Sequence, residues 1–287
     1  RGSIYALIAL GYTMVYGIIQ LINFAHGEIY MIGAFVALIV SGVLTIYGFS
    51  GVSILILAAL IAAIYAAAYG YTLEKIAYRP LRNAPRLSPL ISAIGMSLFL
   101  QNYVLLAQTP DFLPFPALIP DFDFMEPIAH IMGSPELVIL VTSAVSMVAL
   151  TVLIKYTRIG KAMRATQQDM TMARLVGVNV DNVISMTFVI GSVLAAIGGV
   201  LVGSYIGQIN FYIGFMAGVK AFTAAVLGGI GNIPGAVLGA LVLGLTEAYA
   251  AGYISSAYED VFAFGVLVLI LILRPSGLLG KAVKLKV

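Results

Sequence analysis

Charge is what this sequence has least of. Only 9% of its 287 residues are Asp, Glu, Lys or Arg, and it contains no cysteine. The absence of cysteine excludes disulfides, thiol catalysis and cysteine-ligated metals. A soluble domain carries about 25% charged residues, whereas this chain is 61% hydrophobic. The composition therefore indicates a protein embedded in a lipid bilayer.

Motifs for catalysis and for metal binding are also lacking. The two histidines, His26 and His130, are too few and too far apart for a metal site without cysteine, so we expect none. A phosphate-binding loop needs GxxxxGK followed by Ser or Thr, but alanine follows both Gly160-Lys161 and Gly280-Lys281. We therefore expect no ATP hydrolysis by this chain, no enzymatic activity and no cofactor. The net charge of +3 comes without an aromatic-laced basic patch, which argues against nucleic acid.

Thirteen of the fifteen Lys and Arg residues lie in three short segments, namely 74–87, 155–181 and 274–287. The stretches without any charged side chain are 29–73, 87–110, 137–154, 182–219 and 221–246. A charged residue at the centre of a bilayer costs about 2.5–3.5 kcal/mol on insertion scales, so these gaps predict membrane spans. Because cationic loops stay in the cytoplasm, the three basic segments and the C-terminus are expected there.

We expect an all-α, polytopic helical bundle of about eight to ten transmembrane helices, since a crossing takes about 20 apolar residues. The predicted spans lie near 4–22, 29–47, 52–73, 88–107, 137–154, 183–206, 213–231, 234–252 and 259–273. They form one transmembrane domain, 1–287. The loop 108–136 is acidic, rich in proline and without Lys or Arg, so we expect it outside and not helical. Because the chain begins at Arg1 and not at methionine, we expect it to be part of a longer protein.

Two places conflict with a simple series of spans. Polar residues at 23–28 separate two apolar runs by too little for a loop, and Lys220 falls inside the span 213–231. At least one broken or half-spanning helix would explain both, and irregular backbone at membrane depth must line a cavity or be buried in protein. These polar groups either line a conduit or cap a helix break. The candidate conduit residues are Asn23, His26, Glu28, Gly228, Gly229 and Asn232.

The basic loop 155–181 contains a predicted amphipathic helix, about 161–177. Its mostly apolar stripe consists of Met163, Thr166, Met170, Ala173 and Gly177. Gly177 is expected to end the helix as a C-terminal cap. The stripe could be covered by the membrane surface, by the underside of the bundle, or by a groove on a separate cytoplasmic protein.

Three motifs give the chain an end-to-end resemblance to a known family. They are GSIYALIALG at 2–11, INFAHGE at 22–28 and AFTAAVLGGIGNIPGA at 221–236. The chain resembles the LivH-type permease subunits of bacterial branched-chain amino acid ABC importers. In the loop, Ala173 and Gly177 match the general Glu-Ala-Ala-x-x-x-Gly permease signature, whereas Thr171 and Met172 depart from it.

The resemblance implies a pore-forming subunit in the bacterial inner membrane. Its expected partners are a second, LivM-like permease, two cytoplasmic ATPases that hold ATP and magnesium, and a periplasmic or extracellular amino-acid-binding protein. The segment 161–177 would then couple the permease to an ATPase. The alternatives are an ABC permease for urea, amides or a sugar, and an ATP-independent secondary transporter, which would need ion-coupling carboxylates in the bundle.

Overall fold

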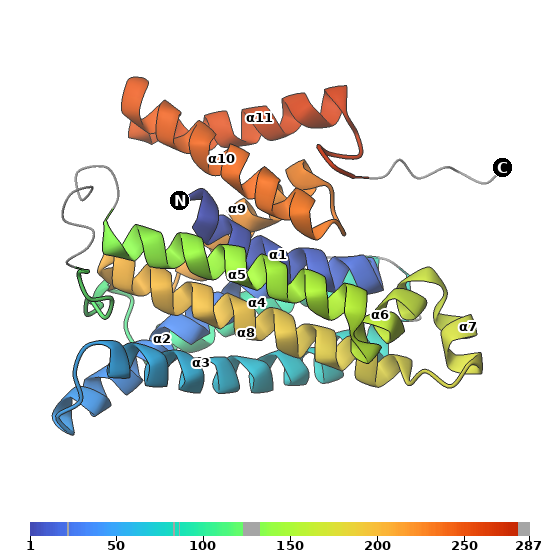
Figure 1. The fold of residues 1–287 in the computed structure, drawn as a ribbon, viewed down its shortest axis with the longest axis horizontal. Helices are drawn as coiled ribbons and strands as arrows, with labels where there is room; N and C mark the ends of the chain where they lie inside the picture. The colour runs from blue at the N-terminus through green and yellow to red at the C-terminus, as the bar shows by residue number, and fades with distance from the viewer. Residues whose placement is uncertain (22, 83, 86, 123–132, 281–287) are drawn as a thin grey trace.

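The computed structural model describes residues 1–287 except 22, 83, 86, 123–132 and 281–287 (Figure 1). The helices are α1 (Gly2–Ile19), α2 (His26–Ile46), α3 (Val52–Leu73), α4 (Leu87–Ala107), α5 (Ser134–Tyr156), α6 (Arg158–Gln168), α7 (Met170–Leu175), α8 (Val180–Ile206), α9 (Ile213–Gly228), α10 (Ile233–Tyr253) and α11 (Glu259–Leu273). Short π and 3-10 turns, η1 (Glu74–Tyr78) and η2 (Arg79–Leu81), extend α3, and η4 (Ser256–Tyr258) precedes α11.

The predicted helical membrane bundle is confirmed. Among the described residues, eight helices are long and apolar enough to cross a membrane, and α9 is a shorter apolar helix. The remaining regular structure there is a ladder of two residues on each side, β1 (Leu113–Pro114) and β2 (Gln208–Ile209), paired antiparallel with Leu113 opposite Ile209. The chain is therefore a multi-pass membrane protein.

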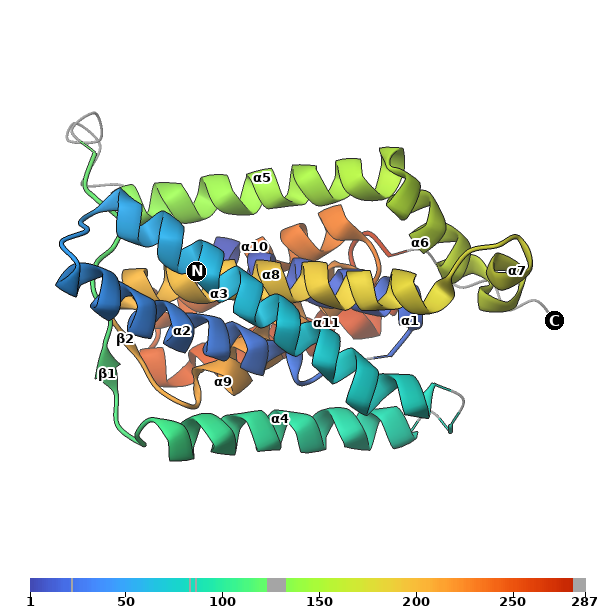
Figure 2. The ribbon, with the colours of Figure 1, turned by 90° about the horizontal axis from the view of Figure 1, so that it is seen from below.

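The centre of the bundle is formed by α1 and α8, the two most buried spans. Figure 1 shows α8 between α5 and α3, and Figure 2 shows α4 on the far side of α2 and α9. Small residues let these helices approach closely: a side chain at Gly33 would collide with Ala196, and one at Gly199 with the backbone of Tyr30. The glycines of α8 thus serve packing inside this chain.

Two helices begin inside the bundle, as the conflicting segments predicted. The first is α2. The chain leaves α1 at Ile19, and the cap residue Gln20, with a φ of 57°, turns it back. α2 then starts at His26, whose ring lies against Gly11 and Gly191, near the middle of α1 and α8. Nearby, α9 starts at Ile213, and its Gly214 and Gly218 contact Gly27. The short α9 and the inward start of α2 therefore share one crossing point.

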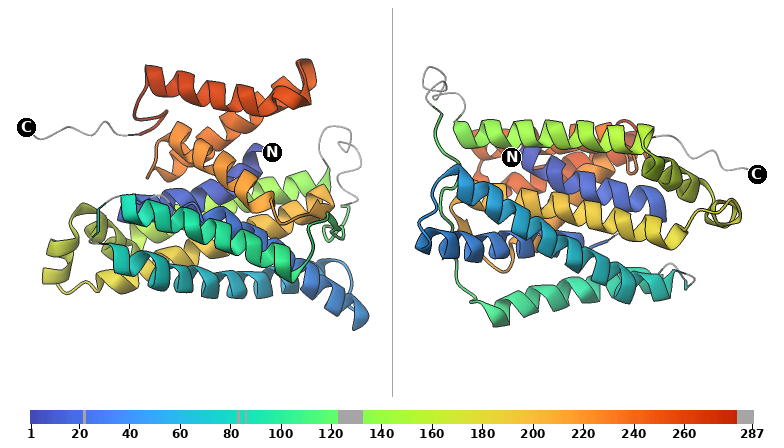
Figure 3. Two further views of the ribbon diagram at one scale, coloured as in Figure 1. Left: turned by 180° about the vertical axis from the view of Figure 1, so that it is seen from behind. Right: turned by 60° about the horizontal axis from the view of Figure 1, so that its bottom comes forward.

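The described parts of the basic segments lie at one end of the bundle. Figure 2 and Figure 3 show that α3 and α5 finish at this end, where α6, α7 and the start of α8 also lie. We call it the basic end. The opposite end carries the ladder of β1 and β2, on which Phe115 and Leu118 are buried against the end of α8. The described part of the segment 108–136 thus has no helix before α5, as its prolines predicted, while 123–132 lies outside the described residues.

A buried carboxylate organises the basic end. Glu74 is fully buried in η1, and it accepts hydrogen bonds from Arg79, Arg82 and the hydroxyl of Ser185. The Glu74–Ser185 distance is 2.7 Å, and Arg82 also pairs with Asp181 at 2.5 Å. These contacts join the end of α3 to the start of α8.

This network predicts that Glu74→Ala destabilises the protein. The substitution leaves Arg82, whose side chain is 10% exposed, without its buried partner. Breaking a buried ion pair in this way costs about 3–5 kcal/mol. The melting temperature of the purified protein in detergent should fall by several degrees, whereas the exposed neighbour substitution Lys75→Gln should leave it unchanged. Equal melting temperatures for the two variants would contradict the assigned role of Glu74.

Candidate functional site

The predicted conduit residues of the first break lie together and are buried. The exposed fractions are 2% for Asn23, 1% for His26 and 0% for Glu28. The side-chain oxygen of Asn23 accepts a hydrogen bond from the Tyr78 hydroxyl at 2.9 Å. Glu28 accepts one from the Ser97 hydroxyl of α4, also at 2.9 Å. The break is thereby anchored to η1 and α4, two elements far away in the sequence.

These three side chains have more hydrogen-bonding atoms than the helix break uses. Asn23 Nδ2, His26 Nε2 and Glu28 Oε2 are buried, and none of them has a hydrogen-bond partner among the described residues. Buried polar atoms are nearly always paired with protein or with water. A break that only needed capping would not require these extra atoms. They favour a place where water or a polar solute passes.

Aromatic residues cover the same break on the side of α9. The Tyr12 ring meets His26 edge-on at a centroid distance of 4.8 Å, and Phe222 lies 5.7 Å from Phe24. A cavity of about 60 Å³ beside them has the following lining: Tyr12, Phe24, Ile94, Ser97, Leu98, Phe215 and Val219. A smaller hollow continues along the same face, with a lining of Tyr12, Tyr16, Phe222, Ala225 and Ile230. We call these two hollows the aromatic cleft.

The second group of predicted conduit residues forms the turn between α9 and α10 at the basic end. Gly229 and Gly231 have φ angles of 105° and 87°, which favour glycine. Asn232 caps α10 by accepting a hydrogen bond from Gly235 N at 3.1 Å, and its amide donates to Leu279 O at 2.7 Å. Gly228 packs against the carbonyl of Gly235. That both groups border one conduit stays a prediction.

The segment predicted as one amphipathic helix is two helices. Asp169 is extended between them, and its carboxylate caps α7 by accepting hydrogen bonds from Thr171 N and Met172 N. The chain leaves α7 at Gly177, whose φ of 86° fits the predicted cap. The aspartate interrupts the helix because it competes for backbone N–H groups.

The predicted stripe of this segment faces the bundle for the most part. Met163, Thr166 and Ala173 are 1–2% exposed, Met170 is partly buried, and Gly177 is exposed. The exposed apolar side chains of α7 are different ones. They are Met172, Leu175 and Val176, which are 61%, 75% and 76% exposed.

Sequence reasoning missed an ionic cluster near the opposite end. Lys220 of α9 lies 3.1 Å from Glu247 of α10 and 2.7 Å from Asp260 of α11. Tyr5 donates a hydrogen bond to Glu247 at 2.6 Å, and Arg1 pairs with Glu259 at 2.5 Å. Isolated charged residues inside apolar runs, such as Lys220 and Glu247, indicate that each needs a buried partner. The sequence does not show which helices meet, so it does not identify the partners.

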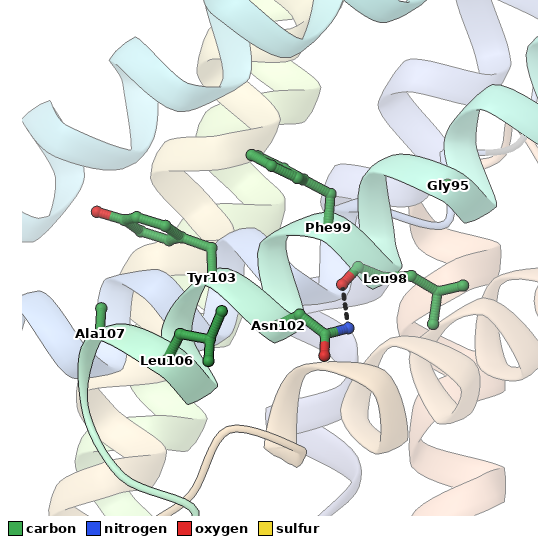
Figure 4. A pocket seen from close by; sticks show the side chains of 7 residues that line it. All are labelled: Gly95, Leu98, Phe99, Asn102, Tyr103, Leu106 and Ala107. Carbon is green, nitrogen blue, oxygen red and sulfur yellow. Dashed lines mark hydrogen bonds between the residues drawn. The ribbon is translucent and has the colours of Figure 1, made fainter.

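The outer face of α4 has a further hollow, shown in Figure 4. Its volume is about 590 Å³, and its lining residues all belong to α4: Gly95, Leu98, Phe99, Asn102, Tyr103, Leu106 and Ala107. The Asn102 amide donates to the Leu98 carbonyl of the same helix at 2.8 Å. Because one helix supplies the entire lining, this hollow does not enclose a ligand.

Comparison with known proteins places these features in one family. Residues 1–271 match the model of the family described as branched-chain amino acid transport system / permease component. The chain is 50% identical to the high-affinity branched-chain amino acid transport system permease protein LivH of Escherichia coli strain K12, over 98% of this chain and 92% of that protein. It is 51% identical, with the same coverage, to the permease protein BraD of Pseudomonas aeruginosa.

A more distant relative covers nearly the same length. This is the probable branched-chain amino acid transport permease protein LivH of Methanocaldococcus jannaschii, 23% identical over 97% of this chain and 89% of that protein. No solved structure matches the chain. The protein belongs to the family of branched-chain amino acid transport permeases, as the motifs predicted.

The turn between α9 and α10 generates a prediction about folding. A methyl group at Gly228 would collide with the carbonyl of Gly235, and overpacking of this kind costs about 1–3 kcal/mol. Gly228→Ala should therefore lower the yield and melting temperature of purified protein. Gly252→Ala, where nothing lies within 4 Å, is the matched control and should behave like the parent. A Gly228→Ala protein that melts with the control would show that this contact is not limiting.

Proposed function

We propose that this protein is a permease subunit of an ATP-driven importer that takes up leucine, isoleucine and valine. The observation that carries the proposal is its identity of 50–51%, nearly end to end, with permeases of high-affinity branched-chain amino acid transport. The aromatic cleft supports it. An apolar wall over a few buried polar atoms suits a zwitterion with an aliphatic side chain, which must pass without binding tightly.

The conduit follows the aromatic cleft beside the first helix break. Tyr12 and Phe222 belong to the wall of the cleft, and the polar groups of the break lie directly behind that wall, where Tyr12 meets His26 and Ser97 donates to Glu28. The cleft belongs to one subunit, so a second permease subunit facing it would complete the path. Gly228, Gly229 and Asn232 shape the turn at the basic end, where the solute would leave.

The basic end faces the cytoplasm in this proposal, and the C-terminus lies there. Cationic loops are retained on the cytoplasmic side of bacterial membranes. The partners are a second, LivM-like permease, two cytoplasmic ATPases that bind ATP and magnesium, and a substrate-binding protein outside. The protein itself needs no cofactor and catalyses no reaction, and it resides in the bacterial inner membrane as a single transmembrane domain.

Coupling to the ATPases takes place through α6 and α7. The buried residues Met163, Thr166 and Ala173 hold these helices to the bundle, while Met172, Leu175 and Val176 project from it. An exposed cluster of three apolar side chains on a short helix fits a groove in a partner protein. The segment 161–177 thus has an inner face for the bundle and an outer face for the ATPase.

Transport assays test the substrate and the energy source together. Proteoliposomes that contain the complete transporter should take up leucine, isoleucine and valine only when ATP is enclosed and the binding protein is present. Ribose and urea should neither enter nor stimulate ATP hydrolysis. Leucine uptake without ATP would instead favour a secondary transporter, and stimulation by urea would favour a permease for another solute.

The outer face of α7 predicts an uncoupling variant. Leu175→Asp places a charge where a groove would bury it, and an unpaired buried charge costs several kcal/mol. We expect the assembly or its ATP-driven leucine uptake to fall by about tenfold or more, with the fold of this subunit intact because Leu175 is 75% exposed. Gln168→Asp, an exposed change on α6, is the control. Wild-type uptake by Leu175→Asp would show that this face does not dock.

A further inference from the structure

A cavity of about 660 Å³ lies at the basic end and shares Ile230 of its wall with the aromatic cleft. It is bounded by α1, α5, α6 and the turn between α9 and α10, and Figure 2 shows α5 and α6 bordering this end of the bundle. The lining residues that matter here are Thr13, Met14, Ile18, Ile154, Lys155, Met163, Arg164 and Ile233. The cavity is large enough for a group bigger than an amino acid.

The charge of the lining is positive and uncompensated. Lys155 and Arg164 both line the cavity, and no acidic residue does. Within the described part of the chain, neither cation forms a salt bridge or a side-chain hydrogen bond. This differs from Arg79 and Arg82 at the same end, which are paired with Glu74. The cavity therefore offers two unpaired cations to an anion.

The wall of the cavity also contains a buried hydroxyl group that is free to form a hydrogen bond. Thr13 of α1 is 1% exposed, and its Oγ1 has no hydrogen-bond partner in the described part of the chain. Several threonines in other helices, such as Thr151 and Thr187, donate to a backbone carbonyl one turn earlier. Thr13 differs from these in being buried and unpaired within the described part of the chain, and it lies in the wall of the cavity that Lys155 and Arg164 also line.

The lining discriminates between possible occupants. A free amino acid carries an ammonium group, which would meet Lys155 and Arg164 with no carboxylate to compensate. A phosphate diester has only negative charge, and guanidinium and ammonium groups bind phosphate oxygens well. Met14, Ile18, Ile154 and Met163 provide apolar surface beside the cations, as an acyl chain requires. Basic pockets between membrane helices on the cytoplasmic side are where anionic head groups bind.

We propose that this cavity binds the phosphate head group of an anionic phospholipid, with an acyl chain along its apolar wall. The occupant would contact α6 through Arg164 and Met163 and the turn between α9 and α10 through Ile233. It would therefore bridge the segment that couples to the ATPase and the turn that ends the conduit. The binding itself does not depend on which solute the protein transports.

Lipid binding to the purified protein, in the assembly with which it is isolated, tests the proposal. The probes are phosphatidylglycerol, phosphatidylcholine with the same acyl chains, inorganic phosphate and leucine. The readouts are the melting temperature and the lipid retained in native mass spectra. Phosphatidylglycerol alone should raise the melting temperature of the parent protein and remain bound to it.

Charge variants make the test specific. In Lys155→Gln/Arg164→Gln, phosphatidylglycerol should bind about thirtyfold more weakly, because each cation near an anionic lipid contributes about 1 kcal/mol. The control, Arg158→Gln/Lys161→Gln, removes the same charge from exposed residues that do not line the cavity and should bind as the parent does. Thr13→Val keeps the shape of the wall and should bind several-fold more weakly, which provides a second test if the double variant does not fold.

Four results would overturn the proposal. Equal binding of phosphatidylglycerol by the double variant and its control would show that Lys155 and Arg164 do not contribute to the site. Equal binding of phosphatidylcholine would show that charge is not recognised. A full effect of inorganic phosphate alone would indicate a site for free anions, and stabilisation by leucine that the double variant abolishes would indicate an amino-acid site.

Discussion

The start of α2 in the middle of the bundle is the constraint on which the remaining structure depends. The first N–H groups of a helix have no partner within the helix, and hydrocarbon provides none. The chain meets this demand by surrounding the break with protein. His26 N bonds to Asn23 O at 3.1 Å, and Ile29 N bonds to Ala25 O at 3.3 Å. Glycines in α1, α8 and α9 bring their backbones close enough to exclude lipid.

The same crossing explains why the proposed conduit coincides with the helix break. Once α2 begins at depth, the space that a straight span would fill is left to α9, which also begins there. Side chains from Tyr12, Phe24 and Phe222 then meet over the break, and Ser97 reaches it from α4. Polar atoms are needed to hold the break, and those left unpaired are available to a solute. A permease can thus obtain a weakly polar surface from the requirements of its own fold.

Much of this architecture could be predicted from the sequence, because the bilayer imposes a simple rule on charge. The uncharged stretches between the basic segments predicted the bounds of the spans to within a few residues. The polar residues at 23–28 predicted the helix break. Partners across helices could not be predicted. Nothing local indicates that Lys220 meets Asp260 or that Tyr78 reaches Asn23, since such pairings depend on how distant helices pack.

The coupling segment shows a second limit of pattern reading. Its apolar spacing predicted one helix with one buried stripe, and Met163 and Thr166 are indeed buried. The spacing could not show that Asp169 would divide it, because an aspartate within a helical pattern is only mildly unfavourable until its carboxylate finds N–H groups to cap. The apolar spacing therefore did not predict the exposed apolar residues of α7.

That division has a mechanical meaning. A continuous helix anchored at one end acts as a stiff rod, so a push on its far end becomes a torque on the anchor. Two helices that meet at a single extended residue, as α6 and α7 do at Asp169, form a joint. Such a joint transmits a push or a pull but lets the outer helix pivot. Met163 and Thr166 anchor α6, and Ala173 anchors α7. A partner bound to the exposed side of α7 can therefore tilt it about Asp169, within the range that the Ala173 contact allows, without displacing α6 from the bundle.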